Sequence, residues 1–454
     1  MKNRGIATVL FIILVAANLT GQEVVKRGIL DLRENGFRKE PVVKLNGEWE
    51  FYWHEHLRPV DFIKADTGSR FIYTKVPSYW TDLTDSIEGI TPDGYATYRM
   101  RILLPEYFRT DLVFQVPVFD SSYRLYLDGK LVASNGVPGQ KPTETKPGYD
   151  PLVVHYTPNN DTLELVVNVS NYHHRRGGFW LPLTVGPSES MMLKIKREEI
   201  FTAGSLGVLF AFTLFFFIFF IIFLRDKTML YFSLATFGLM VRTMFTGSFP
   251  ALAFVNIPWI WIIRMEYTGT YIAMIFSLLY FYGIYRDNFI RYINTVLISL
   301  FGILILFVLT TPVSLFSWSV LLLIPVVSVN MAYYTVRSFI TLFRKRNYEG
   351  LMALGFVALL LGTLNDIFSS TSSVFLTHKY ILPHTTLFFI LMQAIILIFR
   401  WVHSYNEENR LFREVDFVNR NLENIVIERT TELTNQKGEL EKQNEMIDQK
   451  NREL

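Results

Sequence analysis

The chain of 454 residues contains no cysteine. Disulfide bonds, thiolate nucleophiles, zinc–thiolate sites and iron–sulfur clusters are therefore excluded, and an exported domain must be stabilised by its own hydrophobic core. The sequence also has no phosphate-binding loop, no His-Glu-x-x-His pair, no nucleophile elbow and no kinase signature. The net charge of +3 is too small to indicate a nucleic-acid partner. We therefore predict no catalytic residues, no bound metal and no cofactor.

Long apolar runs are abundant, and they lie between residues 199 and 404. This block divides into seven segments, and each is long enough for a helix to cross about 30 Å of hydrocarbon. Most of the segments lack the polar face that a helix of a soluble protein would carry. The sequence therefore predicts a seven-helix transmembrane domain at 199–404, with spans at 200–224, 229–249, 259–285, 290–310, 313–342, 350–370 and 384–404.

Lys and Arg are unevenly distributed over the links between these spans. The links after the first, third and fifth spans are basic, whereas the links on the opposite side carry only Lys379. Because basic links stay in the cytoplasm, we expect residues 23–190 outside the membrane and the tail, residues 405–454, inside. Residues 1–22 have the basic start and short apolar core of a signal peptide, and an uncleaved anchor is the alternative.

Residues 23–190 are rich in short alternating runs, which predicts one extracellular β-sandwich. In residues 163–169, apolar side chains at every second position predict a strand with one buried face. The pair Asp128-Gly129 between two strand-like runs predicts a tight hairpin turn. We expect four aromatic residues to fill the sandwich core rather than to stack on a ligand: Trp49, Phe51, Trp80 and Tyr98.

The order of motifs in this region carries a resemblance. The motifs are Leu45–Phe51, Val76–Trp80, Tyr95–Arg99, Tyr126–Val132 and Leu163–Ser170. Together they resemble the galactose-binding-like jelly roll that lies beside the catalytic barrel of β-galactosidase-type hydrolases. No barrel follows in this chain, so the catalytic acids of those hydrolases have no counterpart here.

A second resemblance comes from the combination of signal peptide, sandwich, seven spans and charged helical tail. This combination resembles the bacterial seven-transmembrane receptors with diverse intracellular signalling modules. The stretch Asn168–Trp180 is similar to the end of their extracellular domain, and Leu361–Asp366 is similar to part of their membrane domain. The resemblance implies a bacterial inner-membrane receptor. Such receptors usually continue into an effector domain, and this chain departs from that pattern.

Residues 405–454 have the composition of a polar helix with a weak apolar seam. Leu411, Leu422 and Leu433 are eleven residues apart, and from Leu433 onward apolar residues recur every seven. Because such repeats favour helix pairing, the tail is predicted to be a cytoplasmic coiled coil in a homodimer. A solvated single helix is the alternative.

Two sets of polar residues are candidates for function. The loop after residue 170 offers amide, imidazole, guanidinium and indole groups, which bind sugars and small anions. The alternative is that this loop packs on the helical bundle or on membrane lipid head groups. The second set lies within the predicted spans and predicts an ion-pair network in the outer half of the membrane. The alternatives are a fixed structural pair, or an Arg264 side chain that extends to the membrane surface. The first set is Asn171, His173, His174, Arg175, Arg176 and Trp180, and the second is Arg242, Arg264, Glu266 and Asp366.

The sequence as a whole predicts a receptor that senses an extracellular ligand, a carbohydrate or a small anion, and relays it through seven helices to a dimeric tail. The alternatives are a transporter with a sugar-binding cap, and a receptor that has lost its effector enzyme or recruits one in trans. The sequence does not name the ligand.

Overall fold

The computed structural model describes residues 24–34, 36–63, 70–222, 226–285, 288–345, 351–370 and 381–453. The predicted signal peptide and Lys379 lie outside these ranges. The described residues form two compact units, of which the first extends to Asn330 and the second begins at Met331.

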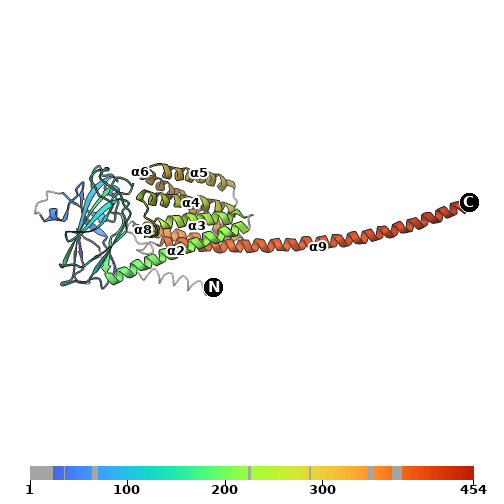
Figure 1. Cartoon of the computed structure of the whole chain (residues 1–454), viewed down its shortest axis with the longest axis horizontal. Helices are drawn as coiled ribbons and strands as arrows, with labels where there is room; N and C mark the ends of the chain where they lie inside the picture. Colours follow the sequence, from blue (N-terminus) through green and yellow to red (C-terminus); the bar gives the residue numbers. More distant parts are fainter. Residues whose placement is uncertain are drawn as a thin grey trace. The chain divides into compact units, whose positions relative to one another are not determined.

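The first unit begins with a β-sandwich of two sheets (Figure 1). The larger sheet has the strand order β4-β3-β5-β10-β7-β8, with β1 paired in parallel to β5. Its strands are β1 (Ile29–Asp31), β3 (Gly47–Trp53), β4 (Ile72–Val76), β5 (Gly94–Leu103), β7 (Ser122–Leu127), β8 (Lys130–Asn135) and β10 (Thr162–Asn171). The smaller sheet has the order β2-β11-β6-β9 and consists of β2 (Val43–Lys44), β6 (Leu112–Val116), β9 (Leu152–Tyr156) and β11 (Thr184–Pro187). Short 3-10 turns lie at η1 (Pro59–Phe62) and η2 (Trp80–Leu83).

The sandwich core forms where the alternation of the sequence predicts it. Strand β10 pairs with β5 along its whole length, so that Leu165 lies opposite Met100 and Val167 opposite Tyr98. The four apolar residues at alternate positions of 163–169 are at most 1% exposed. Trp49, Phe51, Trp80 and Tyr98 are likewise at most 1% exposed, which confirms their predicted place in the core. The predicted β-sandwich is therefore confirmed.

The predicted hairpin is also present, between β7 and β8. Asp128 and Gly129 have φ values of +43° and +83°, as a two-residue turn with both central residues in the left-handed region requires. The Asp128 carboxylate accepts hydrogen bonds from the Glu164 amide and the Tyr156 hydroxyl, which ties the turn to both sheets.

The helices of the first unit follow β11 directly and lie side by side in Figure 1. Helices α2, α4 and α5 in this unit, and α9 (Leu382–Glu453) in the second, are long and apolar enough to cross a membrane. Helix α7 begins in the first unit and ends in the second. The bounds are α2 (Ser188–Ile222), α3 (Lys227–Met244), η3 (Pro250–Ala253), α4 (Trp259–Tyr285), α5 (Asn288–Thr310), α6 (Val313–Phe316), η4 (Ser317–Ser319) and α7 (Val320–Lys345).

Several helix ends differ from the predicted ones. Helix α2 begins at Ser188, twelve residues before the predicted span. The prediction followed apolarity alone, and residues 188–199 are helical although many of their side chains are polar. The predicted span 313–342 is divided into α6, η4 and α7. A helical region with several apolar helices is thus confirmed, while the number and limits of the seven spans stay a prediction.

The second unit consists of the end of α7, α8 (Met352–Ser370) and α9 (Leu382–Glu453). The rings of Phe356 in α8 and Phe389 in α9 are 5.2 Å apart. Gly362 brings the α8 backbone so close to Thr385 that a Cβ atom would lie 2.1 Å from the Thr385 hydroxyl oxygen. Helix α9 continues without interruption from the predicted last span into the tail, where nearly all side chains are exposed. The tail is helical, and its pairing into a coiled coil stays a prediction.

Candidate functional site

The loop that follows β10 is held in one conformation by Asn171. The buried Asn171 amide donates to the carbonyl oxygens of Pro92 and His174, at 2.7 and 2.6 Å. Its carbonyl oxygen accepts from the backbone N–H groups of His173 and His174. Since the whole Asn171 side chain is used in this way, it shapes the loop and has little capacity left for a ligand.

The second half of the loop is fixed by the close approach of two glycines. A Cβ atom on Gly177 would lie 2.0 Å from the Pro92 carbonyl oxygen, and Gly178 has a φ of +114°. The space opened by these glycines lets the backbone of residues 177–179 form hydrogen bonds with residues 78–80. A larger residue at either position would displace the loop. The two glycines are therefore required for the path that the loop takes over the end of the sandwich.

Arg176 forms the central ion pair of the site. Its guanidinium nitrogen lies 2.7 Å from the Asp120 carboxylate, and the Asp120 side chain is 1% exposed. The same carboxylate accepts a hydrogen bond from the Tyr149 hydroxyl. The Arg176 guanidinium also lies over the Trp180 ring, 4.2 Å from its centroid. Burial lowers the pKa of Arg176, but Asp120 and Glu266 more than offset this and raise it above its ordinary value. Arg176 is therefore positively charged, and the contact between the two side chains is largely shielded from water.

His174 lies beside this pair and is neutral. Its Nδ1 atom is 3.5 Å from the Asp120 carboxylate and accepts a hydrogen bond from the Arg176 backbone N–H. Burial, reinforced by the positive charges of Arg176 and Arg175 and opposed by Asp120, lowers the pKa of His174 to about 3. His173 contacts a different part of the unit, since its Nε2 atom is 3.2 Å from the Thr145 carbonyl oxygen and its ring lies 6.2 Å from that of Trp259.

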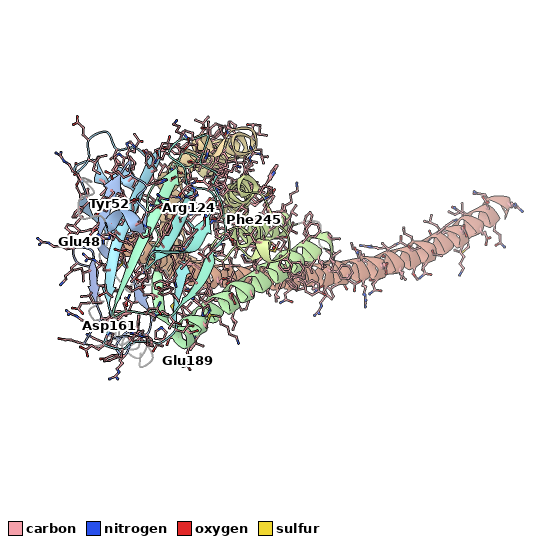
Figure 2. The ribbon with its side chains drawn as sticks, turned by 60° about the vertical axis from the view of Figure 1, so that its left-hand side comes forward. Glu48, Tyr52, Arg124, Asp161, Glu189 and Phe245 are labelled. Carbon is pink, nitrogen blue, oxygen red and sulfur yellow. The ribbon has the colours of Figure 1, made fainter. Side chains whose placement is uncertain are left out.

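The loop contacts the helices of the first unit directly. The Arg175 backbone N–H donates to the Ser317 hydroxyl in η4, and the Ser317 carbonyl oxygen accepts from the Tyr267 hydroxyl in α4. An apolar cluster lies next to these bonds and joins the sandwich to α3, η3 and α4. Its members are Val118, Tyr149, Phe245, Phe249, Leu252, Ile257 and Ile262, of which Phe245 is labelled in Figure 2.

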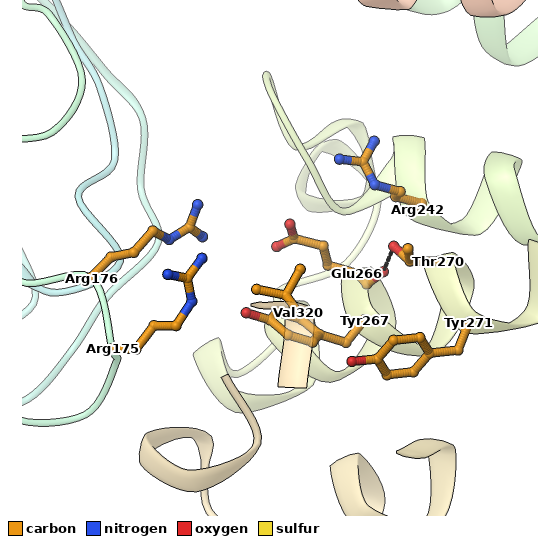
Figure 3. Close-up of a pocket in the computed structure, with 8 residues that line it drawn as sticks. All are labelled: Arg175, Arg176, Arg242, Glu266, Tyr267, Thr270, Tyr271 and Val320. Atoms are coloured by element: carbon orange, nitrogen blue, oxygen red, sulfur yellow. Dashed lines mark hydrogen bonds between the residues drawn. The ribbon is translucent and has the colours of Figure 1, made fainter. Parts of the chain in front are cut away.

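A cavity of about 170 Å³ lies between the loop and the helices. Arg175 and Arg176 line it from the loop, Arg242 from α3 and Glu266 from α4, together with Tyr267, Thr270, Tyr271 and Val320. Figure 3 shows the guanidinium groups of Arg175 and Arg176 extending toward the Glu266 carboxylate, with Arg242 on its other side. Three positive groups and one carboxylate thus surround one small space.

Two of the four predicted intramembrane residues lie elsewhere. The Arg264 guanidinium lies over the Trp261 ring and donates to the Thr311 carbonyl oxygen at 3.4 Å. Asp366 belongs to the second unit, and its carboxylate accepts from the backbone N–H groups of Ile381 and Leu382 at 2.8 and 3.2 Å. It therefore caps the N-terminal end of α9, where a negative charge is favourable. The four-membered network itself stays a prediction, while Arg242 and Glu266 share the cavity with the loop.

Three residues of the site were not predicted from the sequence: Asp120, Tyr149 and Ser317. Asp120 has a φ of +58°, which is unusual outside glycine, but a sequence does not reveal it. No local pattern distinguishes Tyr149 or Ser317 from the many other tyrosines and serines of the chain. Asp120 and Tyr149 lie in links between strands and Ser317 lies in η4, and only the fold brings these three segments close to the loop.

Comparison with known proteins gives one family. Residues 198–400 match the model of a family described as 7TM diverse intracellular signalling. No curated protein matches the chain.

Among solved structures, the matches cover 32% of this chain. They include a GH2 β-galacturonidase from Eisenbergiella tayi bound to galacturonate, with 15% identity, 24% of that chain covered and a TM-score of 0.23. A β-glucuronidase from an uncultured Clostridium species has 19% identity, 29% coverage and a TM-score of 0.25. A putative β-galactosidase from Bacteroides fragilis has 16% identity, 22% coverage and a TM-score of 0.24. The chain thus spans less than a third of the length of each of these structures.

Proposed function

We propose that this chain, whose residues 198–400 match the family model described as 7TM diverse intracellular signalling, is a sensory receptor that relays a signal from its sandwich to its tail. The observation that carries the proposal is the position of Arg176. This side chain pairs with Asp120 of the sandwich and lines the cavity that Glu266 of α4 also lines. A change in the sandwich that moves Arg176 therefore changes the charges that face the helices.

We call the contact of Arg176 with Asp120 and the cavity that it shares with Glu266 the junction. The relay works by a shift of the junction between two arrangements. In one arrangement Arg176 is held by Asp120, and in the other it moves toward Glu266 and leaves Asp120 with Tyr149 and His174. A ligand drives the shift only if it binds the sandwich better in one arrangement than in the other. A carbohydrate or a small anion outside the cell is the ligand class that we propose, with the sandwich outside the membrane and the tail in the cytoplasm.

The output of the proposed receptor is a paired tail. Apolar side chains at the predicted seam are more than half exposed in the single chain, with Leu440 at 58% and Ile447 at 56%. A polar helix of this length gains little stability by itself, and pairing with a second copy would bury this seam. A movement of the membrane helices would then change the winding of the two tail helices around each other, and this change is the proposed output.

Disulfide crosslinking in membranes tests the proposal, because single cysteines can be placed freely in a chain that has none. We expect L440C and I447C to crosslink between copies, and their matched neighbours E441C and D448C to crosslink weakly. Equal yields at all four positions would show that no seam exists, and the dimeric output would be excluded.

The link from junction to tail is tested by adding Asp120→Asn to L440C. This change weakens the pair with Arg176 at constant side-chain shape, so it should alter the crosslinking yield of L440C. Asp31→Asn, which weakens the exposed Asp31–Arg33 pair, is the matched control and should leave the yield unchanged. A receptor relay is contradicted if both substitutions leave the yield of L440C as it was.

A further inference from the structure

We propose that the cavity between the sandwich loop and the helices binds a small oxyanion, a carboxylate or a phosphate, through Arg175 and Arg242. This proposal deepens the proposed function, because it gives the relay a ligand at the junction itself. It rests on the cavity and its lining residues.

The charges around the cavity are unbalanced. Arg175, Arg176 and Arg242 contribute three positive charges, while Glu266 and the Asp120 partner of Arg176 contribute two negative charges, which leaves +1. His174 is neutral and does not change this sum. Arg175 is half-buried and Arg242 is exposed, so the cost of the uncompensated charge falls mainly on Arg175. The site therefore favours a ligand that brings a negative charge.

The donors that remain for a ligand are guanidinium groups. In the described part of the chain, neither Arg175 nor Arg242 forms an ion pair, and the buried Nε of Arg175 has no hydrogen-bond partner. The hydroxyl groups of the lining are already used: Tyr267 donates to the Ser317 carbonyl, Thr270 donates to the Glu266 carbonyl, and Tyr271 is bonded to the Ser319 hydroxyl. A sugar needs a mixture of donors and acceptors, whereas guanidinium forks match an oxyanion.

The size of the cavity limits the ligand. Its volume of about 170 Å³ is similar to the roughly 150 Å³ of an engineered cavity that holds benzene. The ligand therefore has on the order of ten non-hydrogen atoms or fewer inside the cavity. A free phosphate or short carboxylate satisfies this limit, and so does the phosphate of a lipid whose acyl chains stay in the membrane.

The Glu266 carboxylate opposes anion binding in this cavity. Its carboxylate lies in the same cavity and faces the guanidinium groups in Figure 3, so it repels an anion that binds them. The structure thus predicts substitutions with opposite effects. Removing a guanidinium should weaken anion binding, and neutralising Glu266 should strengthen it.

The experiment uses the full chain in nanodiscs of neutral phosphatidylcholine. Sodium phosphate and sodium acetate are titrated separately against sodium chloride at constant ionic strength, and the thermal midpoint is followed by tryptophan fluorescence. We expect a saturable increase in the midpoint. Arg175→Gln and Arg242→Gln should raise the apparent Kd about tenfold or more, because each removes a charge-assisted hydrogen-bonding group. Arg38→Gln, an exposed arginine of the sandwich, is the matched control and should have no effect.

A second arm identifies the source of the anion. The midpoint of the chain is compared between neutral nanodiscs and nanodiscs that contain phosphatidylglycerol, without added phosphate or acetate. A stabilisation by phosphatidylglycerol that Arg175→Gln and Arg242→Gln abolish indicates a lipid phosphate, and a response to soluble anions alone indicates a free ligand. Glu266→Gln should lower the Kd in whichever arm responds.

Two outcomes would overturn the proposal. One is the absence of saturable stabilisation in both arms, and the other is binding that neither arginine substitution weakens and Glu266→Gln does not strengthen. Neither outcome affects the crosslinking tests of the receptor, which need no ligand. The anion site and the relay can therefore fail independently of each other.

Discussion

The ion pair between Asp120 and Arg176 permits a sharp test of what burial contributes in this molecule, because the chain contains a matched exposed pair. The Asp31–Arg33 pair has a distance of 2.6 Å and side chains that are 63% and 47% exposed for Arg33 and Asp31. The Asp120–Arg176 pair has a distance of 2.7 Å, with Arg176 18% and Asp120 1% exposed. The two pairs have nearly the same length, but the Asp31 carboxylate also accepts hydrogen bonds from the Arg33 backbone N–H and Nε, so the exposed pair has more bonds and less burial than the Asp120–Arg176 pair.

The perturbation is Asp120→Asn, which keeps the shape of the side chain and the acceptor for the Tyr149 hydroxyl but removes the charge. Removing one partner of a buried pair leaves the other charge uncompensated and costs about 3–5 kcal/mol. For a domain of this size, about 1 kcal/mol shifts the thermal midpoint by roughly 2–4 °C, so the sandwich should unfold roughly 6–20 °C lower. Asp31→Asn should cost about 1 kcal/mol or less, a shift below about 4 °C.

The assay is thermal unfolding of the full chain, with the fluorescence of the buried Trp49 and Trp80 as the signal for the sandwich. Adding Arg176→Gln to Asp120→Asn should recover part of the loss, since the buried charge is then gone from both sides. The reasoning is refuted if Asp120→Asn and Asp31→Asn shift the midpoint equally. The double variant must also be no less stable than Asp120→Asn alone.

Further expected outcomes concern pH, the start of α9 and topology. The folded pKa of His174, about 3, lies below its ordinary value of 6.5, so its stabilising contribution is complete above pH 6.5 and is lost as the pH falls. Between pH 7 and pH 5 this loss amounts to about 2 kcal/mol, and His174→Gln should remove it from unfolding curves measured at both pH values. Asp366→Ala removes the cap of α9 and should lower the stability of its first turn by about 1 kcal/mol, seen as roughly fivefold faster amide hydrogen exchange there. The control Asp416→Ala, in the exposed part of α9, should not change that rate. A reporter enzyme fused after Pro187 should be active only outside the membrane and one fused after residue 346 only in the cytoplasm, and the opposite result would reject the proposed orientation.

The parts of the fold that depend on local periodicity could be predicted from the sequence. Alternation in residues 163–169 is a local property, and it correctly identified four core residues of β10, although the opposite face is also buried at Val166, Asn168 and Ser170. The Asp128-Gly129 turn was likewise recognisable, because only a few residue pairs adopt two successive positive φ angles. Length and apolarity were sufficient to identify the membrane-embedded region, because the bilayer imposes both on a spanning helix.

The junction could be predicted only in part. The loop of residues 171–180 was recognised from its functional groups, but the sequence does not tell whether a guanidinium faces solvent or a carboxylate 56 positions away, as Arg176 faces Asp120. Asp366 was expected to pair with an arginine because a charge in a membrane helix needs a partner. The backbone N–H groups at the start of α9 meet the same need, and a sequence does not distinguish these two solutions.

The continuity of α9 has a geometric consequence. Helix α9 has 72 residues from the segment that packs on α8 to the end of the tail, and at about 1.5 Å per residue it extends roughly 108 Å. A tilt of about 5° at its first turn therefore moves its far end by roughly 9 Å, more than the rise of one helical turn. The contacts that orient the base, Asp366 at the first turn and Gly362 against Thr385, therefore set the position of side chains far from them. Substitutions at these contacts should have effects that grow with distance along the helix, smallest near Leu411 and largest near Ile447.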